Sequence, residues 1–239
     1  MKSIIRQLQD EGELVLASRI KRILAAETQE EWKTEFPQIK SWGRMTPETL
    51  KKEFPWFLEA KVKDAELDYD DGVLIWNGGV WKNGVWENGK WENGTWKRGT
   101  WYNGIWKDGI WERGTWKDGT WEKGTWEVGV WENGTWLKGT WQDGTWENGT
   151  WGTGVWETGY WDEGLWKSGV WKDGVWEDGI WRNGIWKRGT WLNGHFEKGI
   201  WKSGTWKDGV WEGEASWYGG KIRDKKTKKL LYSFEPPIQ

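Results

Sequence analysis

The sequence predicts a mainly β protein, a parallel β-solenoid with a tryptophan core, preceded by a small α-helical N-terminal domain. Three observations lead to this fold class. From Trp76 to Trp211 the five-residue pattern W-x-x-G-x occurs twenty-eight times, and only Phe196 replaces the aromatic Trp. The Gly three residues after the aromatic position is invariant from Gly79 to Gly209. The first seventy residues are instead rich in helix formers, so they form a separate unit.

The residue before each repeat Trp indicates extended backbone. It is Thr, Val or Ile at twenty-three of the twenty-seven positions from Val80 to Val210, and β-branched residues favour strands. In the segment G-x-W the Gly and the Trp are two residues apart, so they point to the same side of a strand. We expect both to face inward, the β-branched residue to face outward, and the two polar residues after each Trp to form a corner.

A string of β-hairpins is the main alternative fold, because Asn-Gly and Asp-Gly favour two-residue turns, and W-x-N-G resembles the turn of MORN-repeat hairpins. The five-residue period argues against it. Each three-residue strand would have to bond to one neighbour through its first residue and to the other through its third. Residues two apart in an antiparallel strand direct their N–H and C=O groups to the same side. A meander would also expose all its Trp on one face.

The repeat resembles the pentapeptide-repeat family over residues 76–211. In that family each side of a coil carries a small inward residue, a polar outward residue and an inward Leu or Phe; here the inward pair is Gly and Trp. The segment Asp64-Ala65-Glu66-Leu67 has the family's Ala-x-Leu form. The resemblance implies a quadrilateral, right-handed coil of four pentads, hence about seven coils and a rod roughly 35 Å long at strand spacing.

Charge patterns leave a three-pentad coil open as an alternative. At a spacing of twenty residues Glu92, Glu112 and Glu132 would stack like charges, which is unfavourable. At a spacing of fifteen residues Lys172, Lys187 and Lys202 would do the same. Since charge does not decide between the two coil sizes, we take the quadrilateral coil, which the family resemblance implies, as the prediction.

The repeat region divides the chain into four expected segments. These are a helical N-terminal domain or cap over residues 1–59, transition strands over 60–75, the solenoid over 76–211, and a C-terminal capping hairpin over 212–239. The period breaks after Trp211, where residues 212–217 are one residue too long. A solenoid needs caps because an open end exposes apolar core and unpaired strand edges.

Inside the N-terminal segment we expect a helix over residues 3–26. Its apolar stripe consists of Leu16, Ile20, Ile23 and Leu24. The stripe either packs within the domain or meets a second chain. Thr46 and Pro47 are typical of a helix N-terminus, and the apolar cluster at residues 56–58 is expected to pack on the first coil.

Short strands are predicted on both sides of the repeat. Residues 64–67 and 73–75 are expected to pair across a turn at Asp71-Gly72. Residues 221–224 and 230–234 are expected to form a hairpin joined by the basic segment 225–229.

Composition excludes several kinds of chemistry. The chain has no Cys, so it has no disulfide and no thiolate nucleophile. Its one His, His195, is predicted to lie on the surface, and the regular Gly spacing lacks the Lys-Ser/Thr ending of a phosphate-binding loop. We therefore expect no enzyme: no catalytic residue, no cofactor and no metal site.

The charge balance bears on partners. The formal net charge is −2, and residues 76–211 contain eighteen acids and seventeen bases. This balance favours neither nucleic acid nor a strongly charged partner. The N-terminus has no signal-peptide pattern and the chain has no apolar run long enough to span a membrane, so we expect a cytoplasmic or virion-associated protein.

The expected function is a non-enzymatic structural scaffold or protein-interaction module. The W-x-x-G-x pattern resembles that of repeat proteins found in phages and bacteria, so we expect a phage or a bacterium to encode the chain. A carbohydrate-binding adhesin is one alternative. A DNA mimic that acts on topoisomerases, which the family resemblance implies, is another, and the neutral repeat opposes it. Ice binding by Thr rows is opposed because five-residue spacing sends Thr135, Thr140, Thr145 and Thr150 to different sides of a coil.

Two surfaces are candidate contact sites. The first is a run of outward apolar residues, which either marks an interface or only reflects strand propensity. It comprises Tyr160, Leu165, Val170, Val175, Ile180 and Ile185. The second is a lysine cluster that either binds an anion or forms a solvated turn. It comprises Lys225, Lys226, Lys228 and Lys229. The expected partner is a protein, or a second copy bound through the N-terminal helices.

Overall fold

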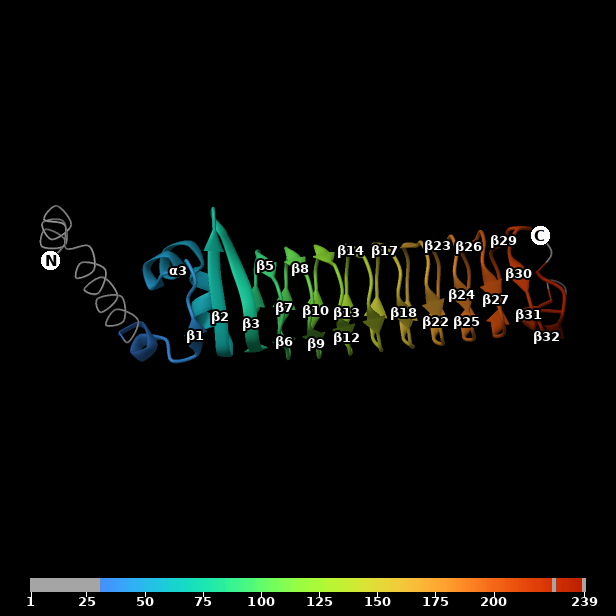
Figure 1. The fold of residues 1–239 in the computed structure, drawn as a ribbon. Helices are drawn as coiled ribbons and strands as arrows, with labels where there is room; N and C mark the ends of the chain where they lie inside the picture. The colour runs from blue at the N-terminus through green and yellow to red at the C-terminus, as the bar shows by residue number, and fades with distance from the viewer. Residues whose placement is uncertain (1–30, 225–226, 238–239) are drawn as a thin grey trace, which may run out of the picture.

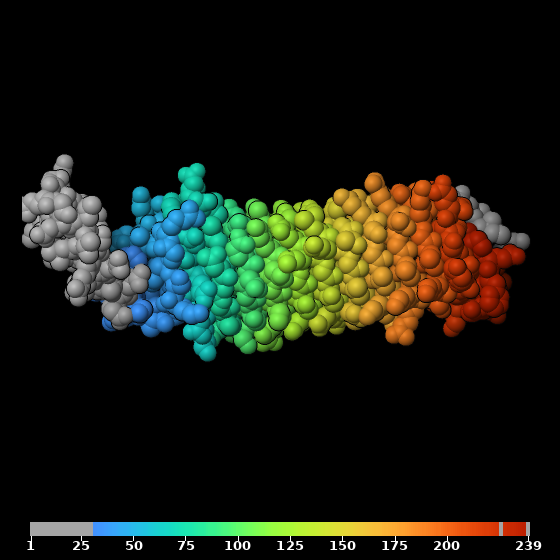
Figure 2. Space-filling model, in the orientation of Figure 1, coloured from blue at the N-terminus to red at the C-terminus, as the bar shows by residue number. Residues whose placement is uncertain are grey.

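The computed structural model describes residues 31–224 and 227–237. The helix expected over residues 3–26 lies outside the described residues. The described chain forms a rod in which short strands stack one behind another along the axis (Figure 1). The space-filling view in Figure 2 shows an elongated body whose width changes little along the repeat. The expected parallel β-solenoid is confirmed.

Each pentad contributes one strand of two residues, the outward residue and the aromatic one that follows it. The strands fall on three faces, which we call A, B and C. Face A contains part of β3 (Val73–Asn83), then β5 (Lys90–Trp91), β8 (Ile105–Trp106), β11 (Thr120–Trp121), β14 (Thr135–Trp136), β17 (Thr150–Trp151), β20 (Leu165–Trp166), β23 (Ile180–Trp181), β26 (His195–Phe196) and β29 (Val210–Trp211). Face B contains the rest of β3, then β6 (Thr95–Trp96), β9 (Ile110–Trp111), β12 (Thr125–Trp126), β15 (Thr140–Trp141), β18 (Val155–Trp156), β21 (Val170–Trp171), β24 (Ile185–Trp186), β27 (Ile200–Trp201) and β30 (Ser216–Trp217). Face C contains β4 (Val85–Trp86), β7 (Thr100–Trp101), β10 (Thr115–Trp116), β13 (Val130–Trp131), β16 (Thr145–Trp146), β19 (Tyr160–Trp161), β22 (Val175–Trp176), β25 (Thr190–Trp191), β28 (Thr205–Trp206), β31 (Gly220–Arg223) and β32 (Leu230–Ser233).

The coil has three sides, so the quadrilateral prediction is wrong. Each strand pairs in parallel with the strand fifteen residues on, as Thr115 with Val130 and Trp116 with Trp131. Three pentads therefore make one coil, and twenty-eight aromatic positions make just over nine coils. With stacked rings 4.8 Å apart, the repeat is about 45 Å long rather than 35 Å.

The size of the indole explains the smaller coil. Consecutive Trp side chains meet edge to face, as Trp121 and Trp126 do with ring centres 6.1 Å apart and planes at 73°. Successive coils stack their rings face to face, as Trp121 on Trp136 at 4.8 Å and 5°. The aromatic side chains from Trp76 to Trp201 are completely buried. Three indoles thus fill the cross-section, and a fourth side would open space that close packing does not tolerate.

The repeat Gly lies where the backbones of two coils approach closely. Gly134 has a φ of +122°, and a Cβ there would lie 2.5 Å from the carbonyl oxygen of Gly119 in the preceding coil. The repeated Gly therefore permits both a positive φ and close stacking of backbones. A Cβ would also meet the indole at several positions, as at Gly89, where it would lie 2.9 Å from the Trp86 ring.

The Asn-Gly and Asp-Gly pairs form corners of the coil instead of hairpin turns. The Oδ1 atoms of Asn103 and Asp118 each accept a hydrogen bond from the amide of the following Gly, both at 2.7 Å. Backbone bonds between coils complete the ladder, as Thr115 N–H to the Gly99 carbonyl at 3.0 Å. Every side of a coil is thereby tied to the coil before it.

The N-terminal cap is built from β1 (Ile39–Ser41), α3 (Pro47–Glu53), η1 (Pro55–Glu59) and β2 (Lys61–Asp70). The predicted helix start is confirmed, because the Thr46 hydroxyl accepts from the Thr49 amide at 3.1 Å and Pro47 begins α3. Strands β2 and β3 are antiparallel and longer than expected. Asp71 and Gly72 form the predicted turn, with φ values of 46° and 82°.

The cap covers the first coil with aromatic rings, as expected. The Phe57 ring lies 5.8 Å from Trp81, and the Trp56 ring lies 5.3 Å from Trp86. Beyond Trp211 the ladder shifts by one residue, so Trp201 pairs with Trp217 and Trp206 with Ile222. The predicted C-terminal hairpin is confirmed as the antiparallel pair β31 and β32. No helix among the described residues is long and apolar enough to span a membrane.

Candidate interaction surfaces

The predicted apolar interface is distributed over all three faces. Tyr160 and Val175 are neighbours on face C, Leu165 and Ile180 on face A, and Val170 and Ile185 on face B. The structure brings these residues together in pairs but not as one patch. Face B carries a longer apolar row that was not predicted from the sequence. It consists of Val155, Val170, Ile185 and Ile200. Grouping residues fifteen apart would have found it.

The residues that follow the Trp form rows of charge along the rod. Face C carries four consecutive acids, Glu132, Glu147, Asp162 and Glu177, while face B carries Lys172, Lys187 and Lys202. The repeat is thus neutral on average but carries a run of like charges on each of these two faces. These two rows are the most uneven part of its surface electrostatics.

Ion pairs between adjacent coils relieve part of this repulsion. Lys117 donates to Glu132 at 2.5 Å, and this hydrogen bond raises the pKa of the Lys117 amine. Burial alone would raise the pKa of the Glu92 carboxyl, but its contacts with Lys90 and Lys107 lower that pKa below its ordinary value. Such exposed pairs each contribute little to stability.

The largest apolar exposure lies at the C-terminal end of the rod. We call it the C-terminal apolar patch; its members are Tyr218, Leu230, Leu231, Tyr232 and Phe234. Tyr232 and Phe234 are 61% and 77% exposed, and their rings meet edge to face at 5.1 Å. Surfaces of this kind usually mark a contact with another macromolecule.

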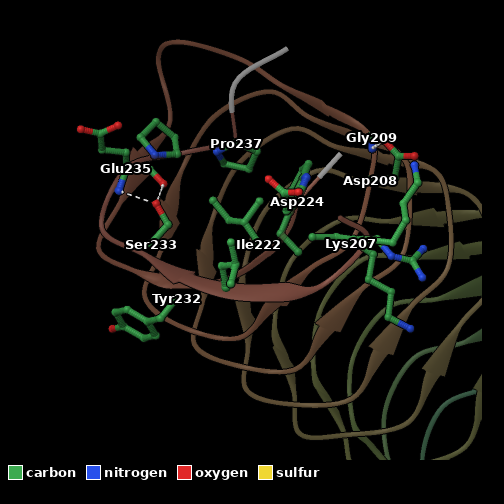
Figure 3. Close-up of a pocket in the computed structure, with 14 residues that line it drawn as sticks. Lys207, Asp208, Gly209, Ile222, Asp224, Tyr232, Ser233, Glu235 and Pro237 are labelled. Carbon is green, nitrogen blue, oxygen red and sulfur yellow. Dashed lines mark hydrogen bonds between the residues drawn. The ribbon is translucent and has the colours of Figure 1, made fainter. Parts of the chain in front are cut away.

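A cavity of about 750 Å³ lies under the C-terminal hairpin (Figure 3). Trp206, Ile222, Leu231, Pro236 and Pro237 supply its apolar walls. Its charged lining is balanced between three bases and three acids, which are Lys207, Arg223, Lys228, Asp208, Asp224 and Glu235. The balance gives the cavity no preference for an anion or a cation.

The predicted lysine cluster is only partly described. Lys225 and Lys226 lie outside the described residues. Lys228 and Lys229 are exposed at the hairpin turn, and the Lys228 amide donates to the Asp224 carbonyl at 2.9 Å. Thr227 also donates to the Asp224 carboxylate through its amide and its hydroxyl. The acid organises this turn, and anion binding by the lysines stays a prediction.

A second cavity, of about 680 Å³, lies beside the N-terminal cap. Its walls include Phe54 and Trp56 from the cap, Leu74 from β3, and Lys90 and Ile105 from the first coils. Its acidic groups are Glu53, Asp70 and Glu87. Mixed charge again gives no clear ligand class.

Groups capable of catalysis are scattered along the described residues. His195 lies at an outward position on face A, and its Nε2 is 2.7 Å from the Glu212 carboxylate. Within residues 31–224 and 227–237, no three His, Asp or Glu side chains are placed to hold a metal ion. Comparison of the chain with protein-family models, with curated proteins and with solved structures finds no match.

Proposed function

We propose that this chain is a non-enzymatic scaffold, a stiff rod that holds protein partners at its two ends at a fixed separation. The observation that carries this proposal is the unbroken aromatic core, with every ring from Trp76 to Trp201 completely buried. The core fills the interior of the repeat, so the place where an active site would gather groups of tuned pKa, a cleft, is found only toward the two ends of the described chain. The ends, in contrast, carry both cavities and the C-terminal apolar patch.

Stiffness follows from how the coils are joined. Adjacent coils share backbone hydrogen bonds on all three faces and stack three aromatic rings at about 4.8 Å. Bending the rod would have to open these contacts on one side. In solenoids each coil contacts only its neighbours, so every junction must hold for the rod to stay straight.

The proposal includes a common design with the pentapeptide-repeat family. The five-residue side and the inward aromatic ring support it, while the three-sided coil separates this chain from a quadrilateral one. A phage or bacterial origin, and location in a virion or cytoplasm, belong to the same proposal and rest on the repeat pattern alone.

The alternatives have less support. Glycan binding would need exposed Trp faces, and the repeat rings are buried. A DNA mimic would need acids on more than one face, whereas face B carries a row of Lys. For ice binding, the longest row that includes these Thr is Thr120, Thr135 and Thr150 on face A, while Thr140 and Thr145 lie on faces B and C.

The distance between labels near the two ends tests the rod. Because the chain has no Cys, Thr100→Cys with Thr205→Cys gives a clean pair on face C, seven coils or about 34 Å apart. Pulsed electron–electron double resonance between nitroxide labels on the two Cys should give a single narrow distribution of distances. Deleting residues 121–135, one complete coil, should shorten it by about 5 Å. A broad distribution, or no shortening, would overturn the proposal.

A further inference from the structure

Each face of the rod carries two rows of outward side chains. On every side of a coil, one residue precedes the buried Trp and one follows it, so both point away from the core. Both also belong to the ladder between coils, since Ile185 N–H bonds to the Gly169 carbonyl at 2.9 Å and Lys187 N–H bonds to the Trp171 carbonyl at 2.8 Å. We call these rows the preceding row and the following row. Neighbours within a row lie one coil apart, about 4.8 Å.

Faces B and C resemble each other in the preceding row and have opposite charge in the following row. The preceding row is mainly apolar on both faces. It contains Val170, Ile185 and Ile200 on face B, and Thr145, Tyr160 and Val175 on face C. The following row contains Lys172, Lys187 and Lys202 on face B, and Glu147, Asp162 and Glu177 on face C.

The chain itself neutralises little of this charge. Like charges on adjacent strands repel, so each row destabilises the isolated rod. Lys172 pairs with Glu157 at 2.7 Å. Among the described residues no ion pair forms at the other five, which are Lys187, Lys202, Glu147, Asp162 and Glu177. A surface of opposite charge and equal spacing would therefore stabilise both rows, and a second copy of the chain carries such a surface.

The orientation of that second copy follows from the order of the rows. If two rods pack face to face and parallel, the lateral order of the rows is reversed, and the charged row of one lies over the apolar row of the other. If the rods are antiparallel, the order is the same on both. The apolar row of face B then lies over the preceding row of face C, and the Lys row lies over the acidic row. Only antiparallel rods satisfy both rows.

The charges also select a register. In antiparallel rods, rising residue numbers on face B meet falling numbers on face C. One register places every Lys of the row opposite an acid and Ile185 opposite Tyr160. Its charged pairs are Lys172–Glu177, Lys187–Asp162 and Lys202–Glu147. A shift by one coil either sets Glu157 against Glu177 or leaves Lys172 opposite Leu192, so both shifted registers are less favourable.

We propose that faces B and C form a self-association surface, on which face B of one rod packs antiparallel on face C of the next with Lys187 opposite Asp162. The two copies use different faces, so each rod keeps one face for a further copy. Because alternate rods are inverted, successive contacts turn in opposite senses, and the assembly is an open ribbon of side-by-side rods. Each contact is narrow, so association should require high concentration.

Light scattering of the full chain over a wide concentration range, at low salt, tests the surface. The mass of the wild type should rise past twice the monomer mass without a plateau. Added salt should reverse this rise, because the contact depends on exposed charges. Negative-stain electron microscopy of the same samples should show rods lying side by side.

Charge reversals test the pairing between copies. Lys202→Glu and Glu147→Lys each create a pair of like charges at every contact, so each should raise the concentration at which association begins about tenfold. An equal mixture of the two variants should associate like the wild type, because each contact between unlike copies again joins an acid and a base. Circular dichroism and Trp fluorescence check that both variants stay folded.

A second mixture is the matched control for direction. Glu177 lies opposite Lys172 in the proposed register, so Glu177→Lys does not compensate for Lys202→Glu. Face B of the Glu177→Lys variant can still pack on face C of the Lys202→Glu variant, but the reverse contact cannot form. The mass of this mixture should therefore stop near twice that of the monomer. In parallel rods Lys202 would instead face Glu177, and this mixture would form the longer assembly.

Four outcomes would overturn the proposal. The first is a wild type that stays monomeric at low salt up to its solubility limit. The second is association that neither single variant weakens, which would assign it to another surface. The third is a first mixture that associates no better than its components. The fourth is a second mixture that associates like the wild type, which would refute the antiparallel register. None of these changes the label distance within one rod, so the scaffold proposal is judged separately.

Discussion

The two ends of the rod differ in how they treat the edges of the last coil. At the N-terminal end β2 pairs with β3 across faces A and B, and the η1 rings Trp56 and Phe57 lie on Trp76, Trp81 and Trp86. At the C-terminal end β29 and β30 have no following strand among the described residues, and β32 exposes its edge and its apolar side chains. One end is covered by its own chain, and the other is left uncovered by the described residues.

The two ends also differ in how much their residues contribute to the stability of the fold. The N-terminal cap has a capped helix, an antiparallel pair and a buried apolar cluster, all of which stabilise the monomer. The C-terminal hairpin instead carries two largely exposed aromatic rings, Tyr232 and Phe234, which contact each other. We therefore expect substitutions at the N-terminal end to cost more folding free energy than equivalent ones at the C-terminal end.

Removing an aromatic ring should give the largest effect. Trp81 is completely buried between Phe57, Trp86 and Trp96, so Trp81→Ala should lower the free energy of unfolding by about 3–5 kcal/mol. Trp217 is half-buried and stacks on Trp201, so Trp217→Ala should lower the free energy of unfolding clearly less. Urea unfolding followed by circular dichroism measures both, and equal losses would remove the contrast between the ends.

A methyl group added to Gly should give the next largest effect. Gly79 has a φ of +109°, and a Cβ would lie 2.5 Å from the Asp64 carbonyl oxygen of the cap. Gly79→Ala should therefore cost roughly 1–3 kcal/mol. Gly213, which has nothing within 4 Å of its Cβ position, is the matched control. Gly213→Ala should leave the thermal midpoint unchanged or slightly higher; a drop as large as that of Gly79→Ala would be inconsistent with this account.

Loss of a hydroxyl at a turn should give a smaller effect. The Thr46 hydroxyl caps α3, so Thr46→Ala should cost about 1 kcal/mol. Thr227 also bonds through its hydroxyl, to Asp224, but its turn is exposed. Thr227→Ala should change stability by less than about 0.5 kcal/mol. Thermal unfolding of both variants makes the comparison, and a larger loss for Thr227→Ala would reverse the ranking.

Acid should have the smallest effect, and it should act on the N-terminal end. Burial alone would raise the pKa of Asp68, but hydrogen bonds from Arg44 and Tyr69 lower it below its ordinary value. A lowered folded pKa stabilises the protein above the unfolded pKa, and this contribution disappears as the pH falls through the folded value.

The free energy of unfolding should accordingly fall on acidification, and it should fall less in Asp68→Asn. Urea titrations from pH 6 down to about pH 2 measure this difference across the range in which carboxylates titrate. High salt should reduce this difference between the two proteins, because salt screens the exposed ion pair between Arg44 and Asp68. Identical pH profiles for the two proteins would show that Asp68 does not contribute.

Much of the fold could be predicted because the repeat carries its own geometry. The β-branched residues that precede most of the Trp correctly predicted the positions of the strands. The direction of backbone hydrogen bonds in a five-residue period correctly excluded a string of hairpins. The coil size could not be predicted in this way. Fifteen-residue spacing does give ion pairs, such as Lys97–Glu112 and Asp173–Arg188. The row of like charges at Lys172, Lys187 and Lys202 argued against this spacing and outweighed the favourable pairs. The row is present in the structure, where Lys172 forms an ion pair with Glu157.

The candidate sites were harder to predict than the core. Adjacent outward positions such as Val170 and Val175 seemed to form one surface, but a coil of three sides places them on different faces. The close approach of Gly79 and Gly134 to the backbone of a neighbouring strand could not be predicted either, because this contact depends on the coil size.

The three-sided coil also relates gene length to the orientation of the two ends. One pentad is encoded by fifteen nucleotides, and it is one third of a coil. Insertion of a single pentad would lengthen the rod by only about 1.6 Å but turn everything after it by a third of a revolution. Insertion of three pentads would add about 4.8 Å and keep the angle. Repeat expansion can thus adjust the direction in which the C-terminal end faces almost independently of its reach.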